Sequence, residues 1–151
     1  MFILILVSID QLSKYIILEG NGVFINDFFS IEISKNTGMA FGFNSGNFSN
    51  ILLSIFVIII VINFMKKQSE LIDFKTNISL CLILGGAFGN LIDRFIRGGI
   101  IDFIRIYKFP IFNIADIFIV SGWILVVMFL IIFSGKNRGE IFEKQDENIR
   151  N

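Results

Sequence analysis

Two aspartates, Asp102 and Asp116, are the residues of this sequence with the greatest capacity for chemistry. They stand in the stretch "GGIIDFIRIYKFPIFNIAD" between two long apolar runs, and each has apolar neighbours on both sides. If both carboxyl groups face one cavity, they cannot comfortably ionise together, so the pKa of one rises and the pair shares a proton at neutral pH. A protonated acid beside a carboxylate can activate water and protonate a leaving nitrogen, as in aspartic proteases.

Both aspartates also have a structural interpretation. Pro110 keeps its predecessor extended, Asn113 is a good helix N-cap, and Asp116 falls at the third helical position. This pattern resembles a capping box with Asp in place of Glu. Asp102 could be an acid in a glycine-rich surface loop. The local pattern leaves the catalytic and the structural interpretations open.

The rest of the residue inventory excludes several kinds of site. The 151 residues include no histidine and one cysteine, Cys81. Without histidine, neither a Ser-His-Asp triad nor a zinc-binding HExxH helix can form, and one cysteine cannot make an intrachain disulfide or a cysteine-cluster metal site. The formal net charge is zero, with no basic face to suggest nucleic acid. We therefore expect chemistry from carboxylates, amides, hydroxyls, Lys and Arg, with no metal and no cofactor.

The composition indicates an integral membrane protein. Apolar residues make up 54% of the chain, and apolar runs recur along nearly its whole length. We predict one domain, an all-α membrane protein with four transmembrane helices at about residues 1–18, 50–66, 77–93 and 113–133. Between and after them lie a connection at about 20–47, a loop at about 94–112 and a polar tail at 134–151. Four spans place both termini on one side, but the distribution of Lys and Arg favours neither orientation.

A small β element is predicted within the connection at about 20–47. In residues 29–34, Phe and Ile alternate with Ser and Glu, and this period of two is typical of a half-buried strand. The later stretch "DFIRIYKF", residues 102–109, is a possible partner. We expect the element to rest on the membrane surface.

Five polar clusters interrupt the apolar chain. They are "DQLSK" at 10–14, "NTGMAF" at 36–41, "GGAFGNLIDR" at 85–94, "GGIIDF" at 98–103 and "FNIAD" at 112–116. If successive helices alternate in direction, all five can converge on one membrane face. The elements that position the two aspartates would therefore be the helix ends and loops on that face.

Two of these clusters have a helical spacing that predicts contacts. Asp10 and Lys14 are four residues apart with the acid first, which predicts an ion pair that neutralises both groups or a polar patch that faces a ligand. Gly85 and Gly89 form a small-xxx-small pair, which predicts a close approach of two helices.

The cluster at 85–94 ends in three further polar residues. Asn90 and Asp93 share one helix face at i and i+3, and Arg94 beside Asp93 can neutralise it and hold loop backbone through its forked donors.

The five motifs, in this order, resemble those of the bacterial lipoprotein signal peptidases (signal peptidase II). The match runs from Asp10 to the fourth predicted span. The resemblance implies an aspartic endopeptidase of the bacterial cytoplasmic (inner) membrane that removes the signal peptide from prolipoproteins, just before a cysteine that carries diacylglycerol. It also implies four transmembrane helices, a small extracytoplasmic β-cradle, and both termini in the cytoplasm.

The resemblance also implies roles for individual residues. Asp102 of "GGIIDF" and Asp116 of "FNIAD" would be the catalytic dyad. The residues that support the site or bind substrate would be Asp10, Lys14, Asn36, Gly86, Asn90, Asp93, Arg94 and Asn113. The partners would be the lipid-modified prolipoprotein and membrane lipids, and we expect the chain to function as a monomer. Only nine residues precede Asp10, where relatives usually carry several more, which predicts either a short first helix or a missing start.

Other classes of function compete with this one. A small membrane transporter or channel could use the aspartate pair as an ion relay, but it would place the acids deep within its spans. A membrane scaffold could use the acids only for capping and pairing. A Ser-Lys protease could use Lys14 with Ser13 or Ser8, although Ser13 is adjacent to Lys14 and would point elsewhere on a helix.

Overall fold

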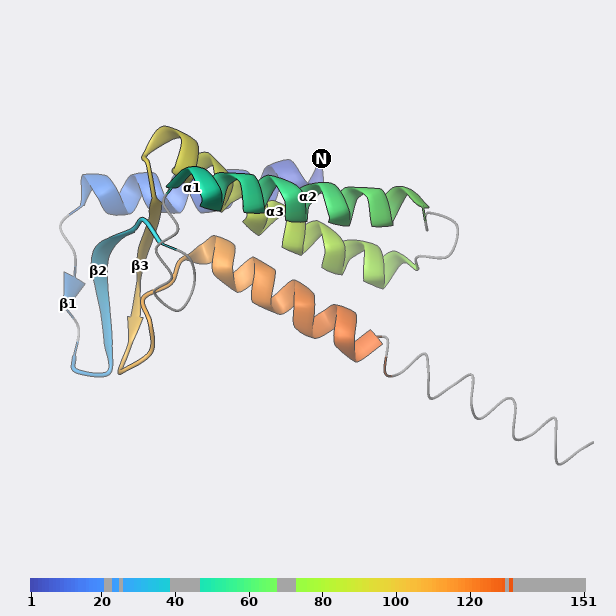
Figure 1. The fold of residues 1–151 in the computed structure, drawn as a ribbon. Helices are drawn as coiled ribbons and strands as arrows, with labels where there is room; N and C mark the ends of the chain where they lie inside the picture. Colours follow the sequence, from blue (N-terminus) through green and yellow to red (C-terminus); the bar gives the residue numbers. More distant parts are fainter. Residues whose placement is uncertain (21–22, 25, 39–46, 68–72, 130, 132–151) are drawn as a thin grey trace, which may run out of the picture.

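Helices that lie lengthwise beside one another, with a small sheet at one end, make up the fold (Figure 1). The computed structural model describes residues 1–20, 23–24, 26–38, 47–67, 73–129 and 131. Within these residues the helices are α1 (Phe2–Glu19), α2 (Asn47–Lys67), α3 (Phe74–Ile96) and a fourth helix, Ile114–Phe129. The strands are β1 (Val23–Phe24), β2 (Phe29–Asn36) and β3 (Ile100–Ile106).

The sheet is antiparallel, with the order β1-β2-β3. Its main ladder joins β2 to β3, from Phe29 opposite Ile106 to Asn36 opposite Ile100, with an irregularity between Ile31 and Ser34. The predicted strand and its partner are therefore confirmed, although β3 begins two residues earlier and ends before Tyr107, which has a positive φ of 46°. The short β1 was not predicted. Residues 21–22, 25 and 39–46 of the predicted connection, residues 130 and 132–133 of the fourth predicted span, and the predicted tail at 134–151 lie outside the described residues.

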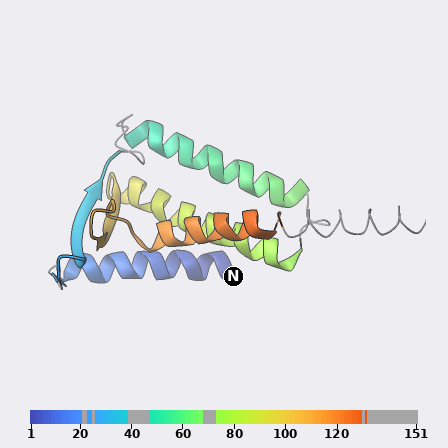
Figure 2. The same ribbon diagram turned by 90° about the horizontal axis from the view of Figure 1, so that it is seen from below.

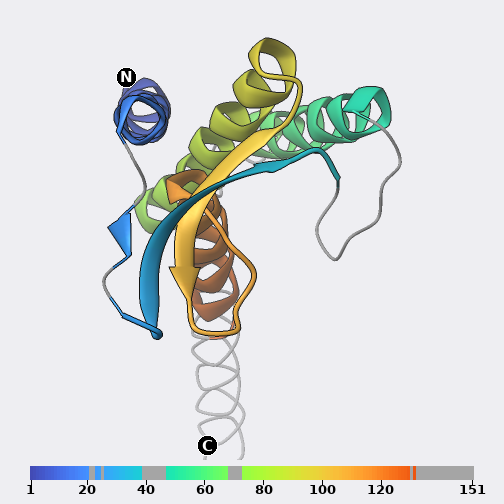
Figure 3. The ribbon, with the colours of Figure 1, turned by 90° about the vertical axis from the view of Figure 1, so that its left-hand side faces the viewer.

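β2 and β3 cross the ends of the helices, so the sheet covers one end of the bundle (Figure 3). β3 follows directly on α3 after Gly98, whose positive φ of 69° suits the sharp reversal. A β-bridge between Ile104 and Phe112 then leads the chain from β3 towards the fourth helix. These connections bring the C-terminal end of α3, the strand β3 and the start of the fourth helix together.

α3 is the central helix, with α1 and α2 on opposite sides of it (Figures 2 and 3). Gly85 lies against α1, where an added Cβ would come within 2.7 Å of the Leu6 Cβ. Gly122 of the fourth helix lies against α3, where a Cβ would come within 2.6 Å of the Ser79 carbonyl oxygen. The predicted close approach of helices at the Gly85 motif is therefore confirmed.

Much of the helical surface is apolar and exposed. α2 and α3 are long and apolar enough to cross a membrane, and the fourth helix is a shorter apolar one. α1 carries three charged residues among its 18. The coarse prediction, a mainly helical protein with apolar spans and a small sheet, is confirmed. That all four helices cross a membrane stays a prediction.

Candidate active site

Asn113 joins the two aspartates. Its Nδ2 donates to the Asp102 Oδ1 at 2.6 Å, and its Oδ1 accepts the backbone N–H of Asp116 at 2.9 Å. In return, the Asp116 Oδ2 accepts the backbone N–H of Asn113 at 3.3 Å. The predicted capping box therefore forms at the start of the fourth helix. It leaves the other carboxylate oxygen of Asp116 available for a different partner.

Asp102 lies on β3 and is nearly buried, with 4% of its surface exposed. Its second oxygen, Oδ2, accepts a hydrogen bond of 3.2 Å from the Nδ2 of Asn36, at the end of the neighbouring strand. Burial, and next the charge of Asp116, raise the pKa of Asp102 to about 6, against the opposing hydrogen bonds from Asn36 and Asn113. A carboxyl group with this pKa can carry a proton close to neutral pH.

Asn90, on α3, connects Asp116 to the interior. Its Nδ2 donates to the Asp116 Oδ1 at 2.8 Å. Its Oδ1 accepts from the Asn113 Nδ2 and from the Lys14 Nζ, each at 3.2 Å. Asp116 itself is only partly buried. The amide side chains of Asn90 and Asn113 thus hold the aspartate pair in place, and the Asp116 side chain is partly exposed.

A buried ionic cluster lies behind this pair. The Lys14 Nζ is 2.8 Å from the Asp10 Oδ2 and 2.8 Å from the Asp93 Oδ2, and all three side chains have an exposed fraction of 0%. The predicted pairing of Asp10 with Lys14 is confirmed, and Asp93 is added to it from α3. Asp93 also forms an ion pair with Arg97, four residues further along the same helix.

The partner of Asp93 was only partly predicted. Among the described residues its ion-pair partners are Lys14 and Arg97. The predicted contact of Arg94 with Asp93 stays a prediction.

Two residues of the cluster were missed in the sequence. Gln11 donates to the Asp10 Oδ2 at 3.0 Å and to the Asp93 Oδ1 at 3.2 Å, and it accepts from the Arg97 Nη1 at 2.9 Å. The i, i+4 spacing of Asp93 and Arg97, with the acid first, could have revealed Arg97. No comparable spacing marks Gln11, because its partner Asp93 is 82 positions away in sequence.

Two glycines of α3 make room for these contacts. A Cβ at Gly86 would collide with the carbonyl oxygen of Ala115, in the first turn of the fourth helix. A Cβ at Gly89 would come within 3.0 Å of the Asp10 Cγ. Gly86, predicted as a supporting residue, therefore permits the approach of the helix that carries Asp116.

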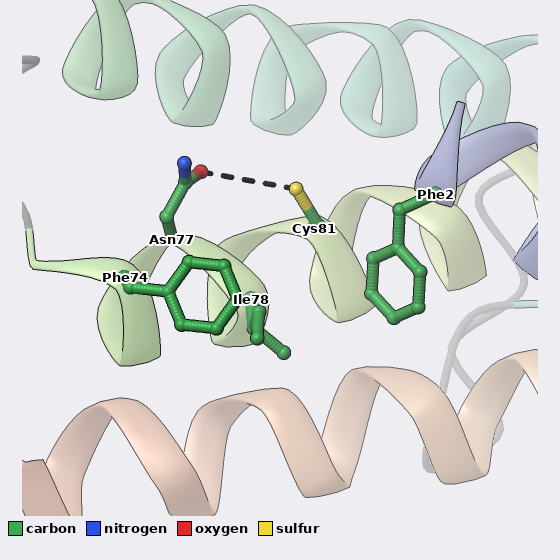
Figure 4. A pocket seen from close by; sticks show the side chains of 5 residues that line it. All are labelled: Phe2, Phe74, Asn77, Ile78 and Cys81. Atoms are coloured by element: carbon green, nitrogen blue, oxygen red, sulfur yellow. Dashed lines mark hydrogen bonds between the residues drawn. The ribbon is translucent and has the colours of Figure 1, made fainter.

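An apolar pocket of about 330 Å³ lies elsewhere, near the start of α3 (Figure 4). Its lining residues are Phe2, Phe74, Asn77, Ile78 and Cys81. The Cys81 Sγ donates to the Asn77 Oδ1 at 3.8 Å, and none of the described residues that line the pocket is charged. Among the described residues, no group of three or more His, Cys, Asp or Glu side chains is placed to hold a metal ion.

This chain is similar to known proteins of one family over most of its length. The family model for signal peptidase (SPase) II matches residues 2–132. A "Lipoprotein signal peptidase" of Haemophilus ducreyi is 34% identical over 137 residues, which cover 83% of this chain and 85% of the relative.

Two solved structures have the same fold. One, a bacterial membrane enzyme solved by the in meso method at 2.3 Å resolution, has a TM-score of 0.79 at 32% identity and covers 89% of this chain and 88% of its own. Another bacterial membrane enzyme, solved by that method at 1.9 Å, has a TM-score of 0.75 at 33% identity, with coverages of 85% and 89%. The matched family model, the relative and the shared fold lead to one conclusion: this chain belongs to the signal peptidase II family and is a membrane aspartic peptidase.

Proposed function

We propose that this protein removes the signal peptide from diacylglyceryl-modified prolipoproteins, cutting just before the lipidated cysteine, with Asp102 and Asp116 as the catalytic dyad. The observation that carries the proposal is the Asn113 side chain, which binds the Asp102 carboxylate and the Asp116 backbone at once. The substrate class is supported by family membership and by the name of the Haemophilus ducreyi relative.

In the first step of the proposed mechanism, Asp116 acts as the general base. Its accessible carboxylate takes a proton from a water molecule while the water oxygen bonds to the scissile carbonyl carbon. Asp102, in its protonated form, donates its proton to the carbonyl oxygen. The product of this step is a neutral tetrahedral diol, with Asp116 now protonated and Asp102 ionised.

In the second step the peptide bond breaks. Asp116 gives its proton to the amide nitrogen, the C–N bond cleaves, and Asp102 takes a proton from a diol hydroxyl as the carbonyl re-forms. The signal peptide leaves with a carboxyl end, and the lipidated cysteine keeps the amino group. Asn90 and Asn113 keep the two carboxyl groups oriented through both proton transfers.

The proposed placement in the bacterial cytoplasmic membrane is supported by the family and by the apolar surface of the helices. The four helices would span the bilayer with both termini in the cytoplasm, and the sheet would rest on the extracytoplasmic surface. The dyad lies where the helices meet the sheet, so water would enter from that face while the signal helix of the substrate stays in the lipid. Exposed apolar residues of α2, such as Phe56 at 60% exposed, would contact membrane lipids. Because one chain supplies both aspartates and their donors, a monomer would suffice.

The proposal is tested by cleavage of a synthetic diacylglyceryl prolipoprotein peptide by purified protein in detergent. Wild type, Asp102→Asn and Asp116→Asn are compared with Asp73→Asn. Asp73 is an exposed acid that caps α3 at the Thr76 N–H, and Asn serves equally well at that position. We expect Asp73→Asn to cleave like wild type and the two dyad variants to lose at least about a thousandfold in rate.

Two outcomes would contradict the proposal. If wild type does not cut before the lipidated cysteine, the substrate assignment is wrong. If wild type cuts and a folded Asp102→Asn or Asp116→Asn variant retains a substantial rate, the dyad assignment is wrong.

A further inference from the structure

Each aspartate of the proposed dyad follows a residue whose backbone N–H is bound by a buried carboxylate. The N–H of Ile101, before Asp102, donates to the Asp93 Oδ2 at 3.1 Å. The N–H of Ala115, before Asp116, donates to the Asp10 Oδ1 at 3.0 Å. Asp93 and Asp10 thus support the two halves of the site in equivalent ways.

Lys14 connects these two supports. Its Nζ lies 2.8 Å from the Asp10 Oδ2 and 2.8 Å from the Asp93 Oδ2, and the exposed fraction of all three side chains is 0%. A continuous path of short polar contacts therefore runs from the backbone beside Asp102, through Lys14, to the backbone beside Asp116.

We propose that Lys14 is a positioning residue, which fixes the separation of Asp102 and Asp116 by holding the two carboxylates that anchor the backbone beside them. This inference rests on the proposed function for its catalytic meaning, although the positioning itself is a property of the fold. Two carboxyl groups can share a proton and flank one water only over a narrow range of separations, and a displacement of about 1 Å can cost on the order of a hundredfold in rate.

The charges of the cluster explain why a cation is needed at this position. Asp10 and Asp93 come from different helices, and without a cation between them they would repel one another in a buried setting. Arg97 binds Asp93 at the rim of the cluster, so the two acids and two bases balance. Lys14 is the cation that contacts both acids, and the neutral Gln11 amide also donates to both, at 3.0 and 3.2 Å. Loss of Lys14 would therefore leave two acids that repel one another joined by a neutral amide.

The deciding variant is Lys14→Met combined with Asp10→Asn. Lys14→Met alone leaves an uncompensated buried carboxylate and could fail to fold. The double variant removes one charge of each sign, and the asparagine that replaces Asp10 can keep an oxygen on the Ala115 N–H. It therefore keeps the support of the fourth helix while removing the connection between the supports.

The matched control is Leu80→Ala, in the apolar core between α2 and α3. It creates a cavity and lowers the unfolding temperature without touching the polar cluster. We expect the double variant to lose about a hundredfold in kcat on the diacylglyceryl peptide with KM within about twofold of wild type, since the replaced side chains are wholly buried. Leu80→Ala should keep the kcat of wild type.

Amide hydrogen exchange at Ile101 and Ala115 provides a measurement that does not depend on activity. We expect the exchange at Ile101 to be at least about tenfold faster in the double variant than in Leu80→Ala, after both are brought to equal global stability by temperature.

The outcomes separate this inference from the proposed function. A folded double variant with kcat within about threefold of wild type, or with unchanged exchange at Ile101, would overturn the positioning role. Failure of wild type to cleave the peptide would refute the proposed function, and the exchange measurement would still decide whether Lys14 positions the two segments.

Discussion

Replacement of Asp102 by Asn should change how stability depends on pH, in a direction opposite to that of most carboxylates. Burial and the charge of Asp116 raise the pKa of Asp102 from 3.8 to about 6. The folded protein therefore binds this proton more tightly than the unfolded chain does. The stabilisation from Asp102 is fully present below pH 3.8 and is lost as pH rises through about 6.

The size of this effect follows from the pKa difference. A rise from 3.8 to about 6 corresponds to about 3 kcal/mol of stability, lost between acid and neutral pH. Asn at this position is neutral at every pH and lacks that dependence. Asn does lower the free energy of unfolding by about 1–3 kcal/mol at every pH. The two oxygens of Asp102 accept hydrogen bonds from the amides of Asn36 and Asn113, and in Asn one of these two oxygens is replaced by an NH₂ group.

Reversible unfolding of wild type and Asp102→Asn in mixed detergent micelles, at pH 4 and at pH 8, measures the effect. Groups common to both proteins cancel in the difference between them. We expect the free energy of unfolding of Asp102→Asn, relative to wild type, to rise by about 2 kcal/mol from pH 4 to pH 8, because a small part of the stabilisation is already lost at pH 4. A change below about 1 kcal/mol would refute the reasoning that Asp102 is a desolvated carboxyl group coupled to Asp116.

Three further predictions concern the same region. With Asp102 as the proton donor, kcat/KM should fall as pH rises through about 6. The alkaline decrease of kcat should occur at a higher pH than that of kcat/KM, because bound apolar substrate excludes water. A pH-rate profile from pH 5 to 9 without an alkaline decrease would contradict this. Gly86→Ala should destabilise the protein by about 1–3 kcal/mol and slow cleavage, because its methyl group meets the Ala115 carbonyl; unfolding and cleavage assays check both, and unchanged values would show that the helix adapts. Asn113→Ala should cost about 0.5–2 kcal/mol as a lost N-cap and abolish cleavage; an active variant would show that the aspartates need no bridge.

Local pattern was enough to predict several parts of the fold. The alternation in residues 29–34 indicated β2 but not which of its faces is buried, because Ser30 is only 2% exposed whereas Ile33 is 45% exposed. The capping box at Asn113 and Asp116 was readable because all its atoms lie within four residues. The Asp10–Lys14 pair was readable for the same reason, since it spans one helical turn.

The remaining contacts depend on segments that are distant in the sequence. The Asp10 Oδ1 binds the N–H of Ala115, which is 105 positions away, and a backbone N–H leaves no trace in the residue types. The contact of Asp93 with Lys14 was not predicted, because Lys14 lies on another helix and is distant in the sequence. These contacts exist only once the packing of α1, α3 and the fourth helix is known.

The outward surface of α1 is more apolar than its composition suggests, because of how the helix is packed. Asp10 and Lys14 would each be costly in a membrane if they faced lipid, but both are wholly buried and paired. The outward face of α1 is apolar, with Leu4 70% and Leu12 59% exposed. A count of its charged residues therefore makes α1 look polar, although its outward face is apolar. Two of its three charges, Asp10 and Lys14, belong to the candidate site, which supports the prediction that α1 spans the membrane with the other helices.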